Sequence, residues 1–212
     1  MSFRVSMIIS DSHKFVFHHV PKTGGSSITA ALAPYSRNYA GVVPEETDGW
    51  QFAFHHPHYM HHRVKNIVPR PSTTYEARDI PESYYSFAFV RNPFDAVVSA
   101  YNHNPTKYKH FDEYVKVQIF SSIEFVARNT QFVYLSDDAG NILVDFVGRY
   151  EKLAEDFYEV MGIIGIPLMI LPKRNISQNK VYDNYREYYS SVSRGLVETK
   201  YKKDLEFFGY EF

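Results

Sequence analysis

A short segment near the start of the chain concentrates groups that can bind an anion. It holds a lysine, two adjacent glycines and three hydroxyl side chains, and these are Lys22, Thr23, Gly24, Gly25, Ser26 and Ser27. Adjacent glycines let the backbone approach a ligand closely, and the N–H groups of such a turn attract negative charge, to which lysine adds a point charge. The segment therefore predicts either an anion site or an ordinary glycine turn that starts a helix.

The order of residues in this segment differs from that in the phosphate loop of nucleoside triphosphatases. That loop has the pattern G-x-x-x-x-G-K-[ST], in which the lysine follows the last glycine. Here Lys22 precedes Gly24 and Gly25, and the chain contains no Gly-Lys pair. A nucleotide kinase or NTPase is therefore the weaker alternative, because the lysine would approach a phosphate from the strand side of the loop.

The element that positions this segment is a strand followed by a helix. Residues 15–20 form an aromatic and β-branched run that ends at Pro21, which is typical of a buried strand. Ser26 or Ser27 can then cap a short helix, which Pro34 stops.

A second strand and helix repeat this order. Residues 85–90 predict a buried strand, Asn92 can cap the next helix, Pro93 suits its first position and Asp95 faces its positive end. The apolar face of that helix has the helical spacing i, i+3, i+4 and i+7, at Phe94, Val97, Val98 and Tyr101. Two such units predict an α/β fold with a parallel sheet.

The rest of the chain predicts further helices and one pair of strands. Helical patterns cover residues 111–128 and 153–164, and Gly165 closes the second helix. Residues 132–135 and 142–147 flank a turn and predict a hairpin or a strand edge. The C-terminal third predicts Tyr-rich helices.

The two strand-to-helix units resemble the donor-binding elements of sulfotransferases that depend on 3′-phosphoadenosine-5′-phosphosulfate (PAPS). The motif P-K-T-G-G-S-S at 21–27 resembles the loop that holds the 5′-phosphosulfate. The motif F-A-F-V-R-N-P-F-D-A-V-V-S-A-Y at 87–101 is similar to the family's 3′-phosphate element, and the resemblance assigns Arg91 and Ser99 to that phosphate. A guanidinium fork and a hydroxyl group suit a phosphate. The resemblance implies a P-loop-like, three-layer α/β fold with a central, mostly parallel sheet flanked by helices.

The C-terminal part resembles the carbohydrate-type branch of the same family, which includes heparan 2-O-sulfotransferases and many small bacterial members. The motifs are V-G-R-Y-E-K-L at 147–153, Y-Y at 188–189 and F-F-G-Y-E-F at 207–212. This branch implies a carbohydrate as the acceptor. In the family a loop after the last core helix often closes over the nucleotide, and the matching basic segment here, otherwise a solvated charge run, is Lys173, Arg174, Asn175, Ile176 and Ser177.

Half of the ten histidines lie close together, at His55, His56, His58, His61 and His62. Imidazole is a common metal ligand, but a structural zinc site takes four well-placed ligands and the chain has no cysteine. Imidazole is also the side chain whose pKa suits a general base near neutral pH. In the resembling family a histidine between the two donor-binding elements takes this role. His56 matches it best, and His58 is the next choice.

Length and composition limit the remaining classes of function. The chain has 212 residues and a formal net charge of −1, so we expect one domain over residues 1–212 and no global basic field for nucleic acid. The lack of cysteine excludes disulfides and thiolate nucleophiles. No segment approaches the length of a membrane span, and the simplest expected location is the cytoplasm.

These residues lead to a hypothesis of sulfuryl transfer from PAPS to an acceptor hydroxyl on a glycan or a small molecule. Lys22 stabilises charge on the 5′-phosphate, Arg91 and Ser99 anchor the 3′-phosphate, and His56 accepts the proton. Adenosine 3′,5′-bisphosphate leaves, and the scheme requires no metal. Two alternatives stay open: a P-loop kinase or NTPase, and a non-catalytic module that binds an anion or a metal through the histidines at 55–62.

Overall fold

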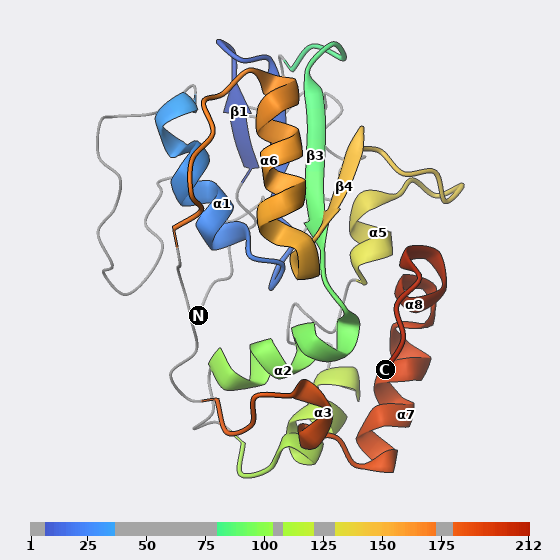
Figure 1. Cartoon of the computed structure of the whole chain (residues 1–212). Coiled ribbons are helices and arrows are strands. Elements are labelled where there is room, and N and C mark those ends of the chain that lie inside the picture. The colour runs from blue at the N-terminus through green and yellow to red at the C-terminus, as the bar shows by residue number, and fades with distance from the viewer. Residues whose placement is uncertain (1–6, 37–79, 104–107, 121–129, 173–179) are drawn as a thin grey trace.

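A four-stranded sheet lies in the upper part of the molecule in Figure 1. This computed structural model describes residues 7–36, 80–103, 108–120, 130–172 and 180–212. The strands stand in the order β1-β2-β3-β4, and their bounds are Met7–Ser10, Phe15–His18, Tyr85–Val90 and Phe146–Arg149. β1 pairs with β2 in antiparallel orientation, whereas β2, β3 and β4 are parallel to one another.

The parallel register brings three chain exits to one edge of the sheet. His18 in β2 pairs with Ala88 in β3, and Val90 in β3 pairs with Arg149 in β4. Because parallel strands end at the same edge, the residues that follow β2, β3 and β4 emerge side by side. This edge is where open α/β sheets bind their ligands.

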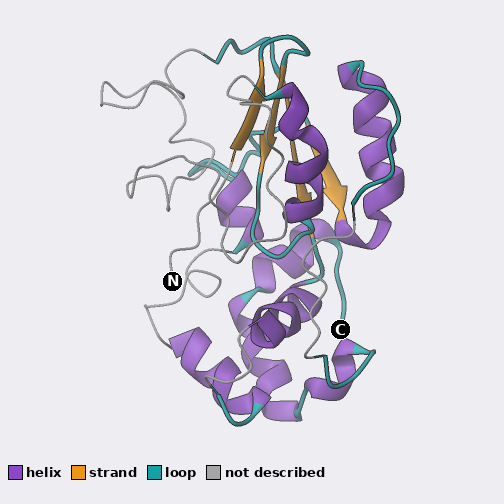
Figure 2. Ribbon diagram, turned by 90° about the vertical axis from the view of Figure 1, so that its left-hand side faces the viewer, coloured by secondary structure: helices purple, strands orange, loops and turns teal. Residues whose placement is uncertain are grey.

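Seven α-helices are found in the described part of the chain. They are α1 Gly25–Leu32, α2 Pro93–His103, α3 Phe111–Phe120, α5 Gln131–Leu135, α6 Leu153–Ile164, α7 Ser191–Lys200 and α8 Lys202–Phe208. Three short 3₁₀ turns lie at Ala33–Tyr35, Tyr150–Lys152 and Tyr185–Tyr188. Figure 2 shows the strands in the upper part of the molecule and a group of helices below them.

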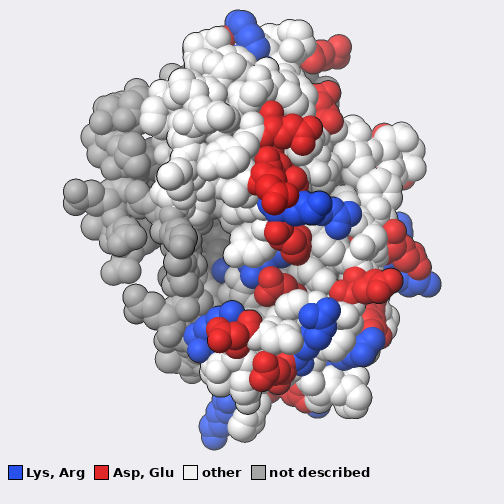
Figure 3. Space-filling model, in the orientation of Figure 1, with Lys and Arg blue, Asp and Glu red and all other residues white. Residues whose placement is uncertain are grey.

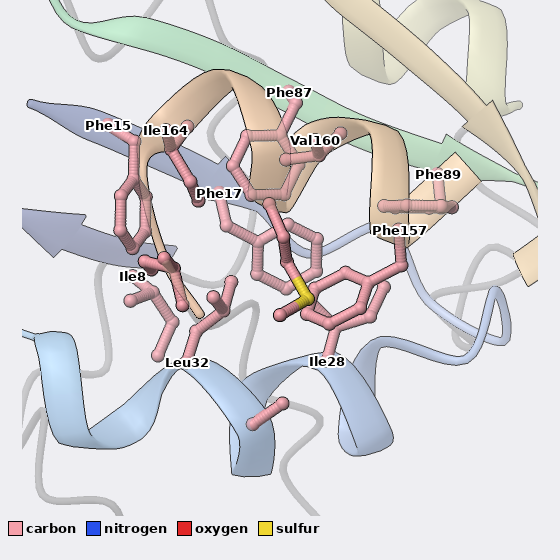
Figure 4. Close-up of a cluster of buried hydrophobic side chains, with 13 residues drawn as sticks. Ile8, Phe15, Phe17, Ile28, Leu32, Phe87, Phe89, Phe157, Val160 and Ile164 are labelled. Atoms are coloured by element: carbon pink, nitrogen blue, oxygen red, sulfur yellow. The ribbon is translucent and has the colours of Figure 1, made fainter. Parts of the chain in front are cut away.

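The two faces of the sheet pack against different helices because side chains alternate along a strand. One face carries Phe15, Phe17, Phe87 and Phe89, which pack against apolar residues of α1 and α6 (Figure 4). The other face carries Ala88 and Val90, which pack against α5 and residues after it, among them Tyr134, Leu135 and Phe208. Burying each large apolar side chain contributes about 1.5–3 kcal/mol, so this two-sided packing holds the strands in place.

A second cluster of aromatic side chains joins the helices below the sheet. Phe94 from α2 contacts Tyr189 and Phe212 edge-on, with ring centroids 5.4 and 4.8 Å apart. Phe111 at the start of α3 also meets Tyr189 edge-on, with ring centroids 4.8 Å apart. These contacts explain the Tyr-rich C-terminal third, whose helices support the start of α2.

The predicted fold class is confirmed, because a mostly parallel sheet lies between helices on both faces. Within the described residues, no helix has both the length and the apolar character needed to cross a membrane. That residues 1–212 form one domain stays a prediction, because residues 37–79 lie outside the described part of the chain.

Two predictions of secondary structure need correction. Residues 132–135 lie in helix α5 and not in a strand. Thr130 caps this helix by accepting from the amide of Val133 at 3.3 Å, and the carboxylate of Asp204 accepts from the amides of Gln131 and Phe132 at 2.8 and 2.9 Å. The expected hairpin is reduced to one antiparallel bridge between Ser136 and Ile142. The second correction is β1, a short edge strand that the sequence pattern did not predict.

Candidate active site

Residues 19–25, which join β2 to α1, form a tight turn that we call the glycine loop. Gly24 precedes α1 with a φ of 81°, a left-handed conformation that glycine adopts without steric cost. The predicted cap by Ser26 or Ser27 is wrong, because Gly24 holds the cap position and both serines lie inside the first turn of α1. Lys22 has a φ of 68°, which costs a non-glycine residue about 1–3 kcal/mol. The fold retains this strain at the residue predicted to carry the charge.

The two glycines are packed so closely that side chains would not fit. A Cβ atom at Gly24 would lie 2.8 Å from Cδ2 of Leu153 and 3.1 Å from Cδ2 of Tyr150. A Cβ atom at Gly25 would lie 1.9 Å from Cδ2 of His19. Side chains of the protein itself therefore pack directly against both glycines and fix the path of the loop backbone.

One hydroxyl group of the glycine loop stabilises the turn, whereas several of its backbone amides make no backbone bond among the described residues. Thr23 is fully buried and donates its hydroxyl to the carbonyl oxygen of Val20 at 2.8 Å, so this hydroxyl stabilises the turn. Ser26 is half-buried and Ser27 is buried in the first turn of α1. No backbone hydrogen bond between described residues uses the amides of residues 22–24. Thr23 can thus serve an anion through its amide and not through its side chain.

The lysine of the loop is cationic near neutral pH, but its charge is poorly solvated. Burial, together with the nearby guanidinium of Arg91, lowers the pKa of Lys22 to about 8. An anion beside the ammonium group would favour its charged form. His19 in the same loop is neutral, because burial and the charge of Lys22 lower its pKa to about 4. Its ring lies against Gly25, so this histidine packs inside the loop.

Residues 91–93, which join β3 to α2, form the arginine junction. The side chain of Arg91 is held on three sides within the described residues. Its Nε donates to Oδ2 of Asp95 at 2.8 Å, its Nη2 lies 2.7 Å from the same oxygen, and its Nη1 donates to the carbonyl oxygen of Lys22 at 3.0 Å. A guanidinium has five N–H bonds, so three contacts leave two for another anion. Arg91 also ties the arginine junction to the glycine loop.

Tyr150 supports both of these segments at once. Its ring lies under the guanidinium of Arg91, with Cζ 3.8 Å from the ring centroid, and its edge lies against Gly24. A cation over an aromatic face gains about 0.5–2 kcal/mol. Tyr150 follows β4 directly, so the third strand end completes the site.

The backbone of the arginine junction is fixed by side chains from distant segments. Gln131 makes two reciprocal hydrogen bonds with the backbone of Arg91, at 2.8 and 2.7 Å. Asn92 accepts from the amide of Phe94 at 3.0 Å, which is the predicted cap of α2, and its own amide donates to Oε1 of Glu151 at 2.7 Å. These bonds hold the start of α2 against the sheet edge.

Helix α2 carries the predicted hydroxyl Ser99 away from the arginine junction. Ser99 is half-buried and stands one helical step of four residues after Asp95, the carboxylate that holds Arg91. Because residues four apart lie on one helix face, Ser99 shares the face of α2 that carries Asp95. The predicted pair of Arg91 and Ser99 is therefore brought to the same side of the helix.

Several predicted residues lie outside the described part of the chain. They are the five histidines His55, His56, His58, His61 and His62, and the basic segment at 173–177. Within the residues that the structure does describe, no group of three or more His, Asp or Glu side chains could hold a metal ion. The base and the loop over the nucleotide thus stay predictions.

The cationic groups of the site are local and do not belong to a basic surface. Figure 3 shows a run of acidic side chains on one face of the molecule, with basic side chains dispersed among them. Helix α6 contributes the exposed Glu155 and Glu159. Lys22 and Arg91 are instead half-buried at the strand ends, where their charges are screened less by water than surface charges are.

Comparison with known proteins places the chain among relatives of one kind. The profile of the sulfotransferase family matches residues 5–211. Carbohydrate sulfotransferase 10 of Xenopus laevis is 23% identical over 97% of this chain and 67% of that protein. Carbohydrate sulfotransferase 14 of Danio rerio is 23% identical over 96% of this chain and 62% of that protein. The chain thus spans about two thirds of the length of these curated relatives.

A shorter relative has a higher sequence identity over half of the chain. An uncharacterized protein of Archaeoglobus fulgidus is 36% identical over 50% of this chain and 86% of its own length. No solved structure is significantly similar to the chain. The family match covers both the glycine loop and the arginine junction, and it agrees with the mostly parallel α/β fold. The chain therefore belongs to the sulfotransferase family.

Proposed function

We propose that the protein transfers the sulfuryl group of PAPS to a hydroxyl group of a carbohydrate. The observation that carries the proposal is the pair of cationic residues, Lys22 and Arg91, joined across the ends of two parallel strands by a hydrogen bond of 3.0 Å. A donor with a phosphosulfate at one end and a separate 3′-phosphate has two anionic groups for these two cations. Membership of the sulfotransferase family supports the same reaction.

The residues of the two segments fit the two ends of such a donor. The amides of residues 22–24 make no backbone hydrogen bond among the described residues, as a phosphate cradle requires. Arg91 has two N–H bonds left for the 3′-phosphate, and Ser99 lies on the same side of α2. Ser26 and Ser27 stand in the first turn of α1, where they can orient the 5′ group.

The donor supplies the sulfuryl group, and the protein positions and stabilises the charges of the transfer. The oxygen of the acceptor forms a bond to sulfur while the bond between sulfur and the bridging oxygen breaks. Lys22 and the loop amides stabilise the charge that develops on that oxygen, which leaves as part of adenosine 3′,5′-bisphosphate. His56 is the proposed base that takes the acceptor proton, with His58 as the second choice. No metal ion takes part in the proposed transfer.

A carbohydrate is the proposed acceptor because two of the relatives are carbohydrate sulfotransferases. The two other classes of function predict different donors or no transfer. A kinase or NTPase would use a nucleoside triphosphate, and a binding module would hold an anion or a metal without turnover.

The test combines a transfer assay with calorimetry. The protein is incubated with labelled PAPS and lactose, N-acetylglucosamine or glucuronic acid, and both labelled product and bisphosphate release are measured. In calorimetry, adenosine 3′,5′-bisphosphate is expected to bind about tenfold or more tightly than 5′-AMP, because a charge-assisted bond contributes about 1.5–3 kcal/mol. Arg91→Ala should remove most of this preference. Arg194→Ala is the matched control, since Arg194 also pairs with an acidic residue at i+4 but is exposed on α7.

Two results would contradict the proposal. Equal affinity of the parent protein for the bisphosphate and for 5′-AMP would remove the basis for naming PAPS. Transfer of label from a nucleoside triphosphate, without transfer from PAPS, would favour a kinase.

A further inference from the structure

The backbone of Arg91 lies just beyond the hydrogen-bonded part of β3. The last residue pairs are His18 with Ala88 on the β2 side and Val90 with Arg149 on the β4 side. Among the described residues, neither neighbouring strand pairs with Arg91, so its amide and carbonyl groups need partners from elsewhere. The side chain of Arg91 is only 11% exposed, which leaves little room for water to supply them.

The side chain of Gln131 supplies both partners. Its Oε1 accepts from the amide of Arg91 at 2.8 Å, and its Nε2 donates to the carbonyl oxygen of Arg91 at 2.7 Å. Two residues of antiparallel strands exchange the same pair of bonds. Gln131 is itself buried, at 7% exposure. Its amide group therefore takes the place of a strand neighbour at the point where the chain leaves the sheet.

A buried carboxylate fixes Gln131 in turn. Asp204 of α8 has no exposed surface, and its Oδ2 accepts from the backbone amide of Gln131 at 2.8 Å. Nε2 of Gln131 lies 3.5 Å from the same oxygen. A flipped side-chain amide would turn Oε1 towards this carboxylate and Nε2 towards the amide of Arg91, so only the observed orientation satisfies both neighbours. Figure 1 shows α5, which carries Gln131, next to α8.

The support of Arg91 thus has two separate parts. Asp95, Tyr150 and Lys22 hold its guanidinium. Gln131 holds its backbone. Without Gln131 two backbone groups would lose their partners in a buried place, and the chain would gain free energy by moving towards water. Such a shift carries the guanidinium with it, and small displacements of a binding group have large effects on a bound ligand.

We propose that Gln131 is a positioning residue, which aims the guanidinium of Arg91 at the 3′-phosphate of the donor and so sets the preference for a 3′-phosphorylated nucleotide. Asp204 supports this role by fixing the orientation of the Gln131 amide. The inference rests on the proposed function, because it concerns the residue that is proposed to bind the 3′-phosphate. Since Gln131 acts through Arg91, its effect on binding must vanish when the guanidinium is absent.

The test is a double-mutant cycle measured by calorimetry. Gln131→Met keeps the length of the side chain and removes both hydrogen bonds. This variant is expected to bind adenosine 3′,5′-bisphosphate about three- to tenfold more weakly than the parent, and 5′-AMP at most about twofold more weakly. In the Arg91→Ala protein the same substitution should change bisphosphate affinity less than about twofold, because the group that it positions is gone.

Thr130→Ala is the matched control. Thr130 caps the same helix, α5, by accepting from the amide of Val133 at 3.3 Å. Among the described residues, no hydrogen bond joins it to Arg91. The control should lower the urea midpoint of unfolding, as Gln131→Met should, but it should keep the parental preference for the bisphosphate over 5′-AMP.

A second variant keeps the test decisive if Gln131→Met does not fold. Gln131→Glu retains the size, but its ionised carboxylate cannot donate to the carbonyl oxygen of Arg91. Burial and the carboxylate of Asp204 favour the neutral form of the new acid, whose O–H group can donate, so bisphosphate affinity relative to the parent should recover as the pH falls from about 8 to about 6. The neighbouring Tyr201 stays neutral over this range, because burial raises its pKa. Division by the parental affinity removes the ionisation of the ligand's own phosphates.

Each contrary outcome identifies what has failed. If the parent protein does not prefer the bisphosphate over 5′-AMP, the proposed function fails and this inference fails with it. If the parent shows the preference and a folded Gln131→Met protein keeps it, the inference alone is wrong. Equal losses of affinity with and without the side chain of Arg91 would also overturn it, because Gln131 would then act on the fold in general. The same holds if Thr130→Ala loses as much preference, or if the relative affinity of Gln131→Glu does not change with pH.

Discussion

The glycine loop and the arginine junction both connect a parallel strand to a helix, but they satisfy their backbone groups in opposite ways. In the glycine loop two residues have positive φ, no side chain caps α1, and the amides of residues 22–24 make no backbone hydrogen bond to described residues. In the arginine junction the amides of Arg91 and Asn92 are bonded by the side chains of Gln131 and Glu151. One segment leaves three amides without a backbone partner among the described residues, and in the other side chains bond the first two amides.

This difference explains why one segment depends on glycine and the other does not. The path of the glycine loop brings Gly24 against Leu153 and Gly25 against His19, so neither position has room for a Cβ atom. A guanidinium on a rigid support needs fixed neighbours, which Asp95 and Tyr150 supply. The bond from Arg91 to the carbonyl oxygen of Lys22 couples the two, so damage to either segment should weaken binding at both ends of the donor.

The largest expected effect follows from removing the charge of the glycine loop. Lys22→Ala should lower turnover about a hundredfold or more, as removal of one charge donor to a transition state does, while circular dichroism stays unchanged. Lys14→Ala is the matched control, because Lys14 also has a positive φ, of 53°, but is exposed between β1 and β2. Unchanged turnover in a folded Lys22→Ala protein would mean that the charge of Lys22 does not contribute to the transfer.

The next largest effect tests whether the glycine loop needs bare backbone. Gly25→Ala would place a methyl group 1.9 Å from the ring of His19, and such overpacking costs about 1–3 kcal/mol. Urea unfolding should show this loss, and calorimetry should show weaker bisphosphate binding. Gly195→Ala is the control, since a Cβ there meets no atom within 4 Å in the middle of α7. It should raise stability by about 0.5–1 kcal/mol and leave binding as it was.

The sequence predicts the arginine junction and helix α6 well because their signals are local. The strand Tyr85–Val90, the Asn92 cap and the helix Leu153–Ile164 with its Gly165 end agree with the structure. Each rests on residues within a few positions of one another, namely a β-branched or aromatic run, a capping side chain and a left-handed glycine.

The features that the sequence misses depend on contacts between distant residues. Helix α5 has a local cap in Thr130, but two further amides of its first turn are bonded by Asp204, which lies 73 residues after Gln131. Tyr150 reaches Arg91 only because β4 pairs in parallel with β3, and that pairing is not visible in the segment itself.

A smaller effect is expected from loosening the arginine junction. Asn92 caps α2, and its Nδ2 donates to the carbonyl oxygen of Glu211 at 2.7 Å. Asn92→Ala should lower the free energy of unfolding by about 2 kcal/mol. Loss of the cap contributes about 1 kcal/mol, and loss of the bond to Glu211 contributes about 1 kcal/mol. The variant should also bind the bisphosphate more weakly. Ser190→Ala removes a similar cap from α7 and should cost about 1 kcal/mol without changing binding. If both variants weaken binding equally, the effect is general destabilisation and not loss of the junction.

The smallest effect is a dependence of bisphosphate binding on pH. The free protein has a Lys22 pKa of about 8, and only the protonated ammonium attracts an anion, so binding raises this pKa and takes up a proton. Affinity should therefore be nearly constant below pH 7.5, fall about twofold by pH 8 and about tenfold by pH 9. The range from pH 7 upward avoids the second ionisation of the phosphates, which lies near pH 6. His19 does not contribute to this pH dependence, because with a pKa of about 4 it is neutral throughout the range.

Calorimetry in two buffers of different ionisation enthalpy should show the proton uptake above pH 7.5. Lys22→Arg, which stays charged, should flatten the pH profile of bisphosphate affinity. The same slope in parent and Lys22→Arg proteins would place the titrating group elsewhere and remove Lys22 from the binding site.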